Sequence, residues 1–148
     1  LRIGWIASKD IELLDKMERM KHYLSICNSS PSEVLSVIAL KSRERILERN
    51  RKIISDNLNL LSPFFEKNKD LFDWKIPDGG CIGYPKYLGD EGVEAFCENL
   101  IENHSIMLLP SSVYQSELGV TVGDHFRIGY GRIKMKEGLE ALEIAMDQ

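Results

Sequence analysis

The stretch between residues 31 and 68 constrains the fold of this chain more than any other. Its apolar residues recur at intervals of about three and four, the spacing of one helix face. They are Val34, Ile38, Ile46, Ile53, Leu58, Leu61 and Phe65. Ser30 before Pro31 predicts an N-cap with proline at the first helical position. One helix over residues 31–68 would be roughly 50 Å long. A single small core cannot bury such a length, so we predict a helix that spans two bodies.

The residues before this helix predict one further strand and one further helix. Residues 1–7, LRIGWIA, are apolar and β-prone and predict a strand. Asp10 is placed to cap a helix over residues 11–27. The chain begins with Leu1 and is apolar from its first residue, whereas a native N-terminus is usually polar and loose. We therefore interpret it as a piece of a larger protein.

The residues after position 68 predict short elements in alternation. LFDWKIP (71–77) and CIGYPKYL (81–88) predict strands around the turn PDGG. A helix over 89–104 should carry its apolar face on Val93, Phe96, Leu100 and Ile101. A strand at 105–110, a loop at 111–124, a strand that starts at Phe126 and a helix at 134–146 complete the order. This order predicts an α+β (or α/β) fold, with helices packed on one side of a small sheet.

Composition excludes several classes of function. The 148 residues are 43% hydrophobic, enough for one domain with a core, and the formal net charge is −4. The acidic balance argues against nucleic acid, and the charged segment KSRERILERNRK mixes acids with bases as a solvated helix face does. No apolar run reaches membrane-spanning length and no signal peptide opens the chain, so we expect no membrane partner.

Cysteine and histidine positions predict no metal site. Cys27, Cys81 and Cys97 share no CxxC spacing, which indicates neither a disulfide framework nor a zinc site and is typical of the reduced cytoplasm. The histidines, at 22, 104 and 125, have no partner at metal-ligand or catalytic-triad spacing. We interpret them as exposed or capping residues.

The segment DHFRIGYGR, residues 124–132, predicts a binding residue. Phe126, Ile128 and Tyr130 alternate with Arg127 and two glycines, so one face of the strand is apolar and the other carries a guanidinium beside almost no side chain. Glycine weakens a strand and often marks a close approach by a ligand. Arginine binds planar carboxylates through two parallel hydrogen bonds. Arg127 is thus a candidate anion-binding residue, and a structural ion pair is the alternative.

Three motifs resemble one enzyme family. LRIGWIAS at 1–8 resembles the segment after the cofactor lysine in class I/II aminotransferases, the fold-type I enzymes that use pyridoxal 5′-phosphate. LLPSSVYQ followed by HFRIGYGR resembles the family's C-terminal signature, and PDGGCIGYP resembles its Gly-Gly turn. The resemblance runs from end to end in the family's order, and the segment GCIGYP is similar to the branch of capreomycidine-synthase-like proteins.

This resemblance implies roles for individual residues. Arg2 would bind the cofactor phosphate, Arg127 the α-carboxylate of the substrate, and Gly79 and Gly80 would form a turn beside the active-site cleft. The Schiff-base lysine would lie upstream of Leu1, so that the isolated chain is expected to be inactive and to contribute no catalytic residue of its own.

The resemblance also implies an organisation and a function. Residues 1–30 would be the end of the large cofactor-binding domain, 31–68 the interdomain helix, and 69–148 the small C-terminal domain with a mainly antiparallel sheet. The parent would be a cytoplasmic homodimer that transfers an amino group between an amino acid and a 2-oxo acid. The alternatives are a sensor domain in a transcription regulator, or decarboxylation, cyclisation or elimination by the same cofactor.

Overall fold

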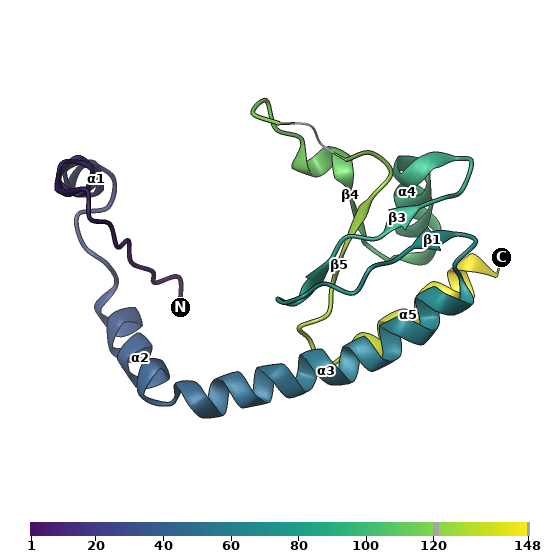
Figure 1. The fold of residues 1–148 in the computed structure, drawn as a ribbon, viewed down its shortest axis with the longest axis horizontal. Coiled ribbons are helices and arrows are strands. Elements are labelled where there is room, and N and C mark those ends of the chain that lie inside the picture. The colour runs from purple at the N-terminus through teal and green to yellow at the C-terminus, as the bar shows by residue number, and fades with distance from the viewer. Residues whose placement is uncertain (120–121, 148) are drawn as a thin grey trace. The chain divides into compact units, whose positions relative to one another are not determined.

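Two compact units make up the chain, and the division between them falls inside a helix. The computed structural model describes residues 1–119 and 122–147. The first unit is Leu1–Glu48 and the second is Arg49–Gln148. Helix α3, Arg43–Lys67, contains the division (Figure 1).

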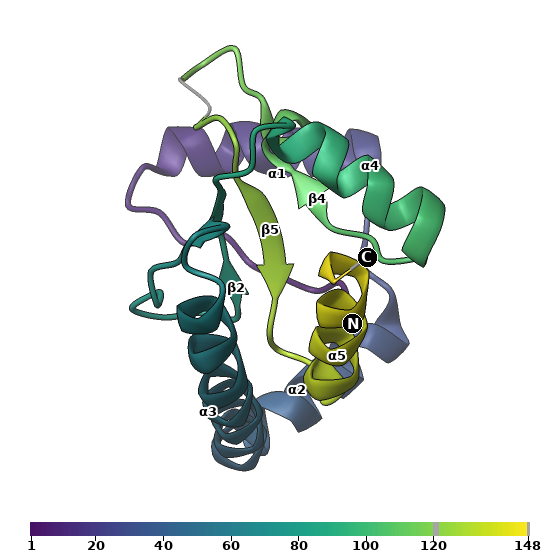
Figure 2. The same cartoon turned by 90° about the vertical axis from the view of Figure 1, so that its right-hand side faces the viewer.

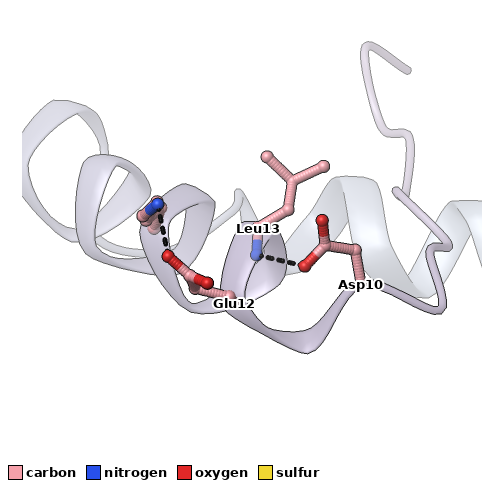
Figure 3. Close-up of polar contacts among 4 residues, drawn as sticks. Asp10, Glu12 and Leu13 are labelled. Atoms are coloured by element: carbon pink, nitrogen blue, oxygen red, sulfur yellow. Dashed lines mark hydrogen bonds and ion pairs between the residues drawn. The ribbon is translucent and has the colours of Figure 1, made fainter.

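Local capping defines the start of helix α1, Ile11–Leu24. The Asp10 carboxylate accepts a hydrogen bond of 2.9 Å from the backbone N–H of Leu13, which satisfies one of the free donors at the helix start (Figure 3). Glu12 adds a negative charge in the first turn, where the helix dipole favours it. The predicted cap is confirmed. The helix ends at Leu24, short of residue 27, and Ile26 has a left-handed φ of 56°.

Residues 1–7 do not form the predicted strand. An extended segment becomes a strand only when its backbone groups bond to a neighbouring strand, and the first unit contains no strand in its described residues. Arg2 interrupts the extended path with a φ of 58°. The β-prone composition of this segment was therefore not sufficient to specify a strand.

The predicted single helix over residues 31–68 is wrong, because Ser42 divides it. Helix α2 spans Ser30–Lys41 and α3 begins at Arg43. Ser42 has φ −101° and ψ 15°, outside the helical range, although its carbonyl oxygen still accepts a hydrogen bond of 3.2 Å from the N–H of Ile46. Serine is a weak helix former, because its side chain competes for backbone hydrogen bonds.

The cap at the start of this stretch also differs from the prediction. The N-cap of α2 is Ser29 and not Ser30, because the carbonyl oxygen of Ser29 accepts the first intrahelical bond, from the N–H of Glu33 at 3.0 Å. Pro63 lies inside α3 and does not end it.

Two small antiparallel sheets form the second unit together with its helices. Strand β1 (Phe72–Asp73) pairs with β3 (Lys86–Tyr87), and the second sheet has the order β2-β5-β4. Its central strand β5, Phe126–Gly129, lies between β2 (Ile82–Gly83) and β4 (Leu109–Pro110) (Figure 2). The antiparallel sheet of the predicted α+β fold is confirmed.

The strands are shorter than predicted, and the two segments predicted around the turn at 77–80 pair with each other only at Phe72–Tyr87 and Asp73–Lys86. CIGYPKYL is divided into β2 and β3 at Pro85, which lacks an N–H and whose carbonyl oxygen accepts a bond of 3.1 Å from Phe126. The segment predicted as a strand over 105–110 is paired only at Leu109 and Pro110. A 3₁₀ helix, Ser111–Tyr114, then opens the predicted loop, of which residues 120 and 121 lie outside the described residues.

Aromatic side chains from α3, α4 and both sheets form the centre of the second unit's core. Phe72 is 1% exposed, and its ring centroid lies between 5.6 and 6.1 Å from five other rings. They belong to Phe64, Phe65, Tyr87, Phe96 and Phe126. These rings connect α3, both sheets and α4. The buried face of strand β5 therefore packs against residues of the same unit.

Helices α4 (Gly92–His104) and α5 (Met135–Met146) complete the core. On α4 the buried residues are Val93, Phe96, Cys97 and Leu100. Ile101, which we predicted on this apolar face, is instead 49% exposed. None of the helices within the described residues combines the length and the apolar character needed to cross a membrane.

Candidate anion-binding site on strand β5

Strand β5 presents Arg127 on the face opposite the core. Phe126, Ile128 and Tyr130 are buried, as the alternating pattern predicted, so Arg127 between them projects to the other side. Its side chain is half-buried, and Nη1 donates a hydrogen bond to the hydroxyl oxygen of Tyr114 at 3.3 Å. Among the described residues no carboxylate lies within ion-pair distance of Arg127, so the structural ion pair, the alternative interpretation, is not observed.

A group of aromatic rings borders this arginine. The Tyr114 ring meets Tyr84 edge to face, with centroids 6.3 Å apart, and Tyr84 stacks on His125 at 5.2 Å. Partial burial raises the pKa of the Tyr84 hydroxyl. His125 donates from Nδ1 to the carbonyl oxygen of Gly123 at 2.5 Å. Because its pKa is raised, the Tyr84 hydroxyl stays neutral over the ordinary pH range.

The two glycines that follow Arg127 serve different purposes. A side chain added at Gly129 would meet nothing within 4 Å, so the strand face beside Arg127 is open there. At Gly131 an added Cβ would lie 3.1 Å from the Cβ of Cys81, closer than ordinary contacts allow. We predicted that both glycines leave space for a ligand. The open surroundings of Gly129 agree with this prediction. For Gly131 the prediction is wrong, because its small size allows close packing against Cys81.

A cavity lies beside this part of the strand. Its volume is about 290 Å³, and its floor is mostly apolar, with residues from β5, α5 and the segment before β4. Three basic residues also line it, and no acidic residue does so: Arg127, Arg132 and Lys134. The positive charge of Arg127 is therefore not neutralised at the cavity wall.

The Gly-Gly turn is open and connected to the end of β5. Gly80 has φ 84°, as a turn glycine is expected to have, and side chains added at Gly79 or Gly80 would meet nothing within 4 Å. The next residue, Cys81, accepts a bond of 2.8 Å at its carbonyl oxygen from the N–H of Tyr130. The structure thus places the turn beside Tyr130, and substrate binding by the two glycines stays a prediction.

Arg2 belongs to the first unit, whereas the other candidate residues belong to the second. Its side chain is exposed and forms no ion pair among the described residues. A free guanidinium of this kind fits a phosphate group, which arginine binds through two parallel hydrogen bonds. The role of Arg2 stays a prediction.

Two residues that the sequence did not single out hold the site together. Asn57 of α3 is 5% exposed, and its side-chain amide donates to the carbonyl oxygens of Tyr130 at 2.8 Å and Arg132 at 2.6 Å. Tyr114 contacts Arg127 directly. The sequence feature that could have identified Asn57 is its place as a polar residue next to the apolar positions of one helix face. Tyr114 lay in a segment that we interpreted as a loop and as part of the family's C-terminal signature, without giving Tyr114 a role.

Comparison with known proteins identifies the fold. The chain is 22% identical over 144 residues to capreomycidine synthase from Streptomyces vinaceus, covering 96% of this chain and 35% of that protein. A solved structure of a pyridoxal-phosphate-dependent aminotransferase from Streptococcus suis superposes with a TM-score of 0.84 at 26% identity, over 99% of this chain and 37% of that one. The chain has the fold of the C-terminal part of a fold-type I pyridoxal-phosphate-dependent aminotransferase. No family model matches the sequence.

The same fold-type I architecture occurs in proteins described by different reactions. A pyridoxal-phosphate-dependent cyclase superposes with a TM-score of 0.75 at 22% identity, over 90% of this chain and 36% of that chain. This chain thus spans little more than a third of the length of the relatives that it matches. The predicted fold class is confirmed, while the reaction differs among proteins that share it.

Proposed function

We propose that this chain is the C-terminal part of a pyridoxal-phosphate-dependent enzyme that transfers an amino group between an amino acid and a 2-oxo acid, and that Arg127 binds the substrate α-carboxylate. The observation that carries the proposal is the set of contacts that Arg127 makes and lacks. Its half-buried guanidinium has no acidic partner among the described residues. Gly129, on the same face of the strand, has open space around it. A guanidinium has five N–H donors, and the bond to Tyr114 leaves enough of them free to bind a carboxylate.

Arg127 would contribute both affinity and orientation. When bound, pyridoxal phosphate supplies a sink for the electrons of a bond that breaks at the substrate Cα. Arg127 would grip the carboxylate on that carbon through two parallel hydrogen bonds, which fixes its rotation about the bond to Cα. A group held in the reactive orientation reacts faster than one that is free to rotate. Replacement of Arg127 would therefore lower both binding and turnover.

The two units would have different places in the full-length protein. We assign residues 1–30 to the end of the cofactor-binding domain, 31–68 to the connection and 69–148 to the small domain. The first unit supports this assignment because none of its residues is buried within the unit, so that its apolar side chains are available to further parts of the protein. Arg2 would bind the cofactor phosphate, and Gly79 and Gly80 would approach the substrate. Free cysteines among the described residues suit the cytoplasm, and the family resemblance suggests a homodimer.

Steady-state kinetics of the full-length protein tests the proposal. Arg127→Ala and Arg127→Lys should lower kcat/KM for amino acids by roughly 30-fold to several thousand-fold, the cost of a lost buried charge pair. Lysine should rescue poorly because it keeps the charge and loses the two-pronged donor. Arg49→Ala, at an exposed arginine of α3 bonded to Asn50, is the matched control and should have little effect. Near wild-type kcat/KM in both Arg127 variants, with normal folding and cofactor content, would remove the proposed role.

Cyclisation of an amino acid is the second candidate, because both capreomycidine synthase and a pyridoxal-phosphate-dependent cyclase resemble this chain. The two reactions differ in their need for an amino acceptor. A transaminase consumes a 2-oxo acid for each amino acid that it converts, whereas a cyclase needs none. Consumption of an amino acid by the full-length protein in the absence of any 2-oxo acid would favour the second candidate.

A further inference from the structure

The segment that carries Tyr114 is fixed next to Arg127 by backbone bonds. Strand β4 pairs with β5 in the register that places Leu109 opposite Arg127. The 3₁₀ helix follows β4 directly, and the N–H of Ser111 donates to the carbonyl oxygen of His125 at 2.7 Å. Tyr114 therefore reaches Arg127 from a segment that directly follows residues paired with Arg127, Phe126 and His125.

The ring of Tyr114 is also held by contacts with other aromatic rings. It meets Tyr84 edge to face at an interplanar angle of 82°, and Tyr84 stacks on His125 at 20°. Such aromatic pairs add stability beyond the area that they bury. The position of the Tyr114 hydroxyl is consequently determined by rings from the segments before β3 and before β5.

A neutral acceptor suits an arginine that must bind an anion. An arginine side chain has large rotamer freedom, and a fixed hydrogen bond reduces it before the ligand arrives. A carboxylate at the same place would restrain the guanidinium equally well but would compete with the ligand for its charge. The hydroxyl of Tyr114 restrains the group and leaves the charge available.

We propose that Tyr114 is a positioning residue, which holds the Arg127 guanidinium in the orientation that binds the substrate carboxylate. This inference rests on the proposed function of Arg127. Tyr114 itself need not touch the substrate. Removal of its hydroxyl should therefore weaken carboxylate binding through Arg127 and leave the content of cofactor unchanged.

Tyr114→Phe in the full-length protein is the direct test, with propionate as a competing monocarboxylate probe. The dissociation constant of propionate and the KM for the amino acid should each rise about tenfold, the effect of one hydrogen bond to a charged group. The value of kcat should fall much less. Ser112→Ala removes a hydroxyl from the exposed part of the same 3₁₀ helix and should change neither constant.

A double-mutant cycle separates this inference from the function on which it rests. In an Arg127→Lys background Tyr114→Phe should have almost no further effect on propionate binding, because the restrained guanidinium is gone. If Arg127→Lys alone leaves propionate binding unchanged, the proposed function fails. If Arg127→Lys weakens binding but Tyr114→Phe does not, or if Tyr114→Phe weakens it equally in both backgrounds, only the positioning role of Tyr114 is overturned.

Discussion

The two units of this chain differ in what stabilises them. The first unit, Leu1–Glu48, has no buried residue, and large apolar side chains such as Trp5 and Tyr23 are 75% and 90% exposed. The second unit contains every residue of the hydrophobic core among the described residues. Helices shorter than about 12–15 residues are marginal in water when nothing packs against them. The helices of the first unit therefore lack the packing that stabilises those of the second.

The largest expected effect is the loss of a core ring in the second unit. Phe72→Ala should destabilise it by about 3–5 kcal/mol, because the ring is buried among five others. Urea unfolding of the 148-residue chain measures this through Trp74 fluorescence in a Trp5→Phe background, since Trp74 stacks on Phe65. Tyr23→Ala in the same background should change the midpoint hardly at all. Equal effects of the two substitutions would break the comparison between the units.

Amide hydrogen exchange should give the next largest contrast. Amides of α1 are expected to exchange on the order of 100-fold faster than those of α4, because local opening of α1 exposes no buried surface. Mass spectrometry of peptides from both helices in one sample provides the measurement and its internal control. Protection of α1 equal to that of α4 would mean that the first unit has cooperative stability of its own.

Loss of the buried Asn57 side-chain amide should have an intermediate effect on the stability of the second unit. Asn57→Ala should destabilise the second unit by about 1–3 kcal/mol, because two carbonyl oxygens lose their partner inside the protein. Asn59→Ala, two residues along the same helix at an exposed position, is the matched control and should cost little. Trp74 fluorescence during urea unfolding again reports the difference. Identical midpoints for the two variants would show that the Asn57 amide contributes nothing to the fold.

The features that the sequence predicted correctly depend on short-range interactions. The features that it missed depend on residues far apart along the chain. The Asp10 cap and the alternation around Arg127 depend on neighbours within a few residues, and both were correct. The division at Pro85, the packing of Gly131 on Cys81 and the bonds of Asn57 depend on residues far along the chain. Periodicity cannot identify such partners. It also could not show that residues 1–7 lack a strand to pair with.

The candidate site was predicted in its central residue and not in its surroundings. The residue pattern alone indicated that Arg127 faces away from the core beside an open glycine. Tyr114 precedes Arg127 by 13 positions, and only the pairing of β4 with β5 brings them together. A one-residue change in the register of that pairing would turn the following segment to the other face of the sheet.

The smallest expected effect is a dependence of stability on pH at the start of α4. The hydroxyl of Tyr87 donates to Glu91, and this bond holds the pKa of the Glu91 carboxyl below its usual value. Because the pKa is lowered on folding, the contribution is present above the usual carboxylate pKa and is lost as the pH falls through the lowered value. Tyr87→Phe should flatten the stability profile in that acidic range. An unchanged slope would show that the bond does not contribute.

The two bonds of Asn57 also fix the spacing between Asn57 and the core residues that follow it in α3. Asn57 shares a helix face with Leu61 and Phe64, and all three are buried in the same unit. Each residue inserted into a helix turns everything beyond it by about 100°. One extra residue between Asn57 and Leu61 would thus force a choice between the amide bonds to the end of β5 and the aromatic core. Proteins that share this arrangement should therefore vary in length on either side of that segment but not within it.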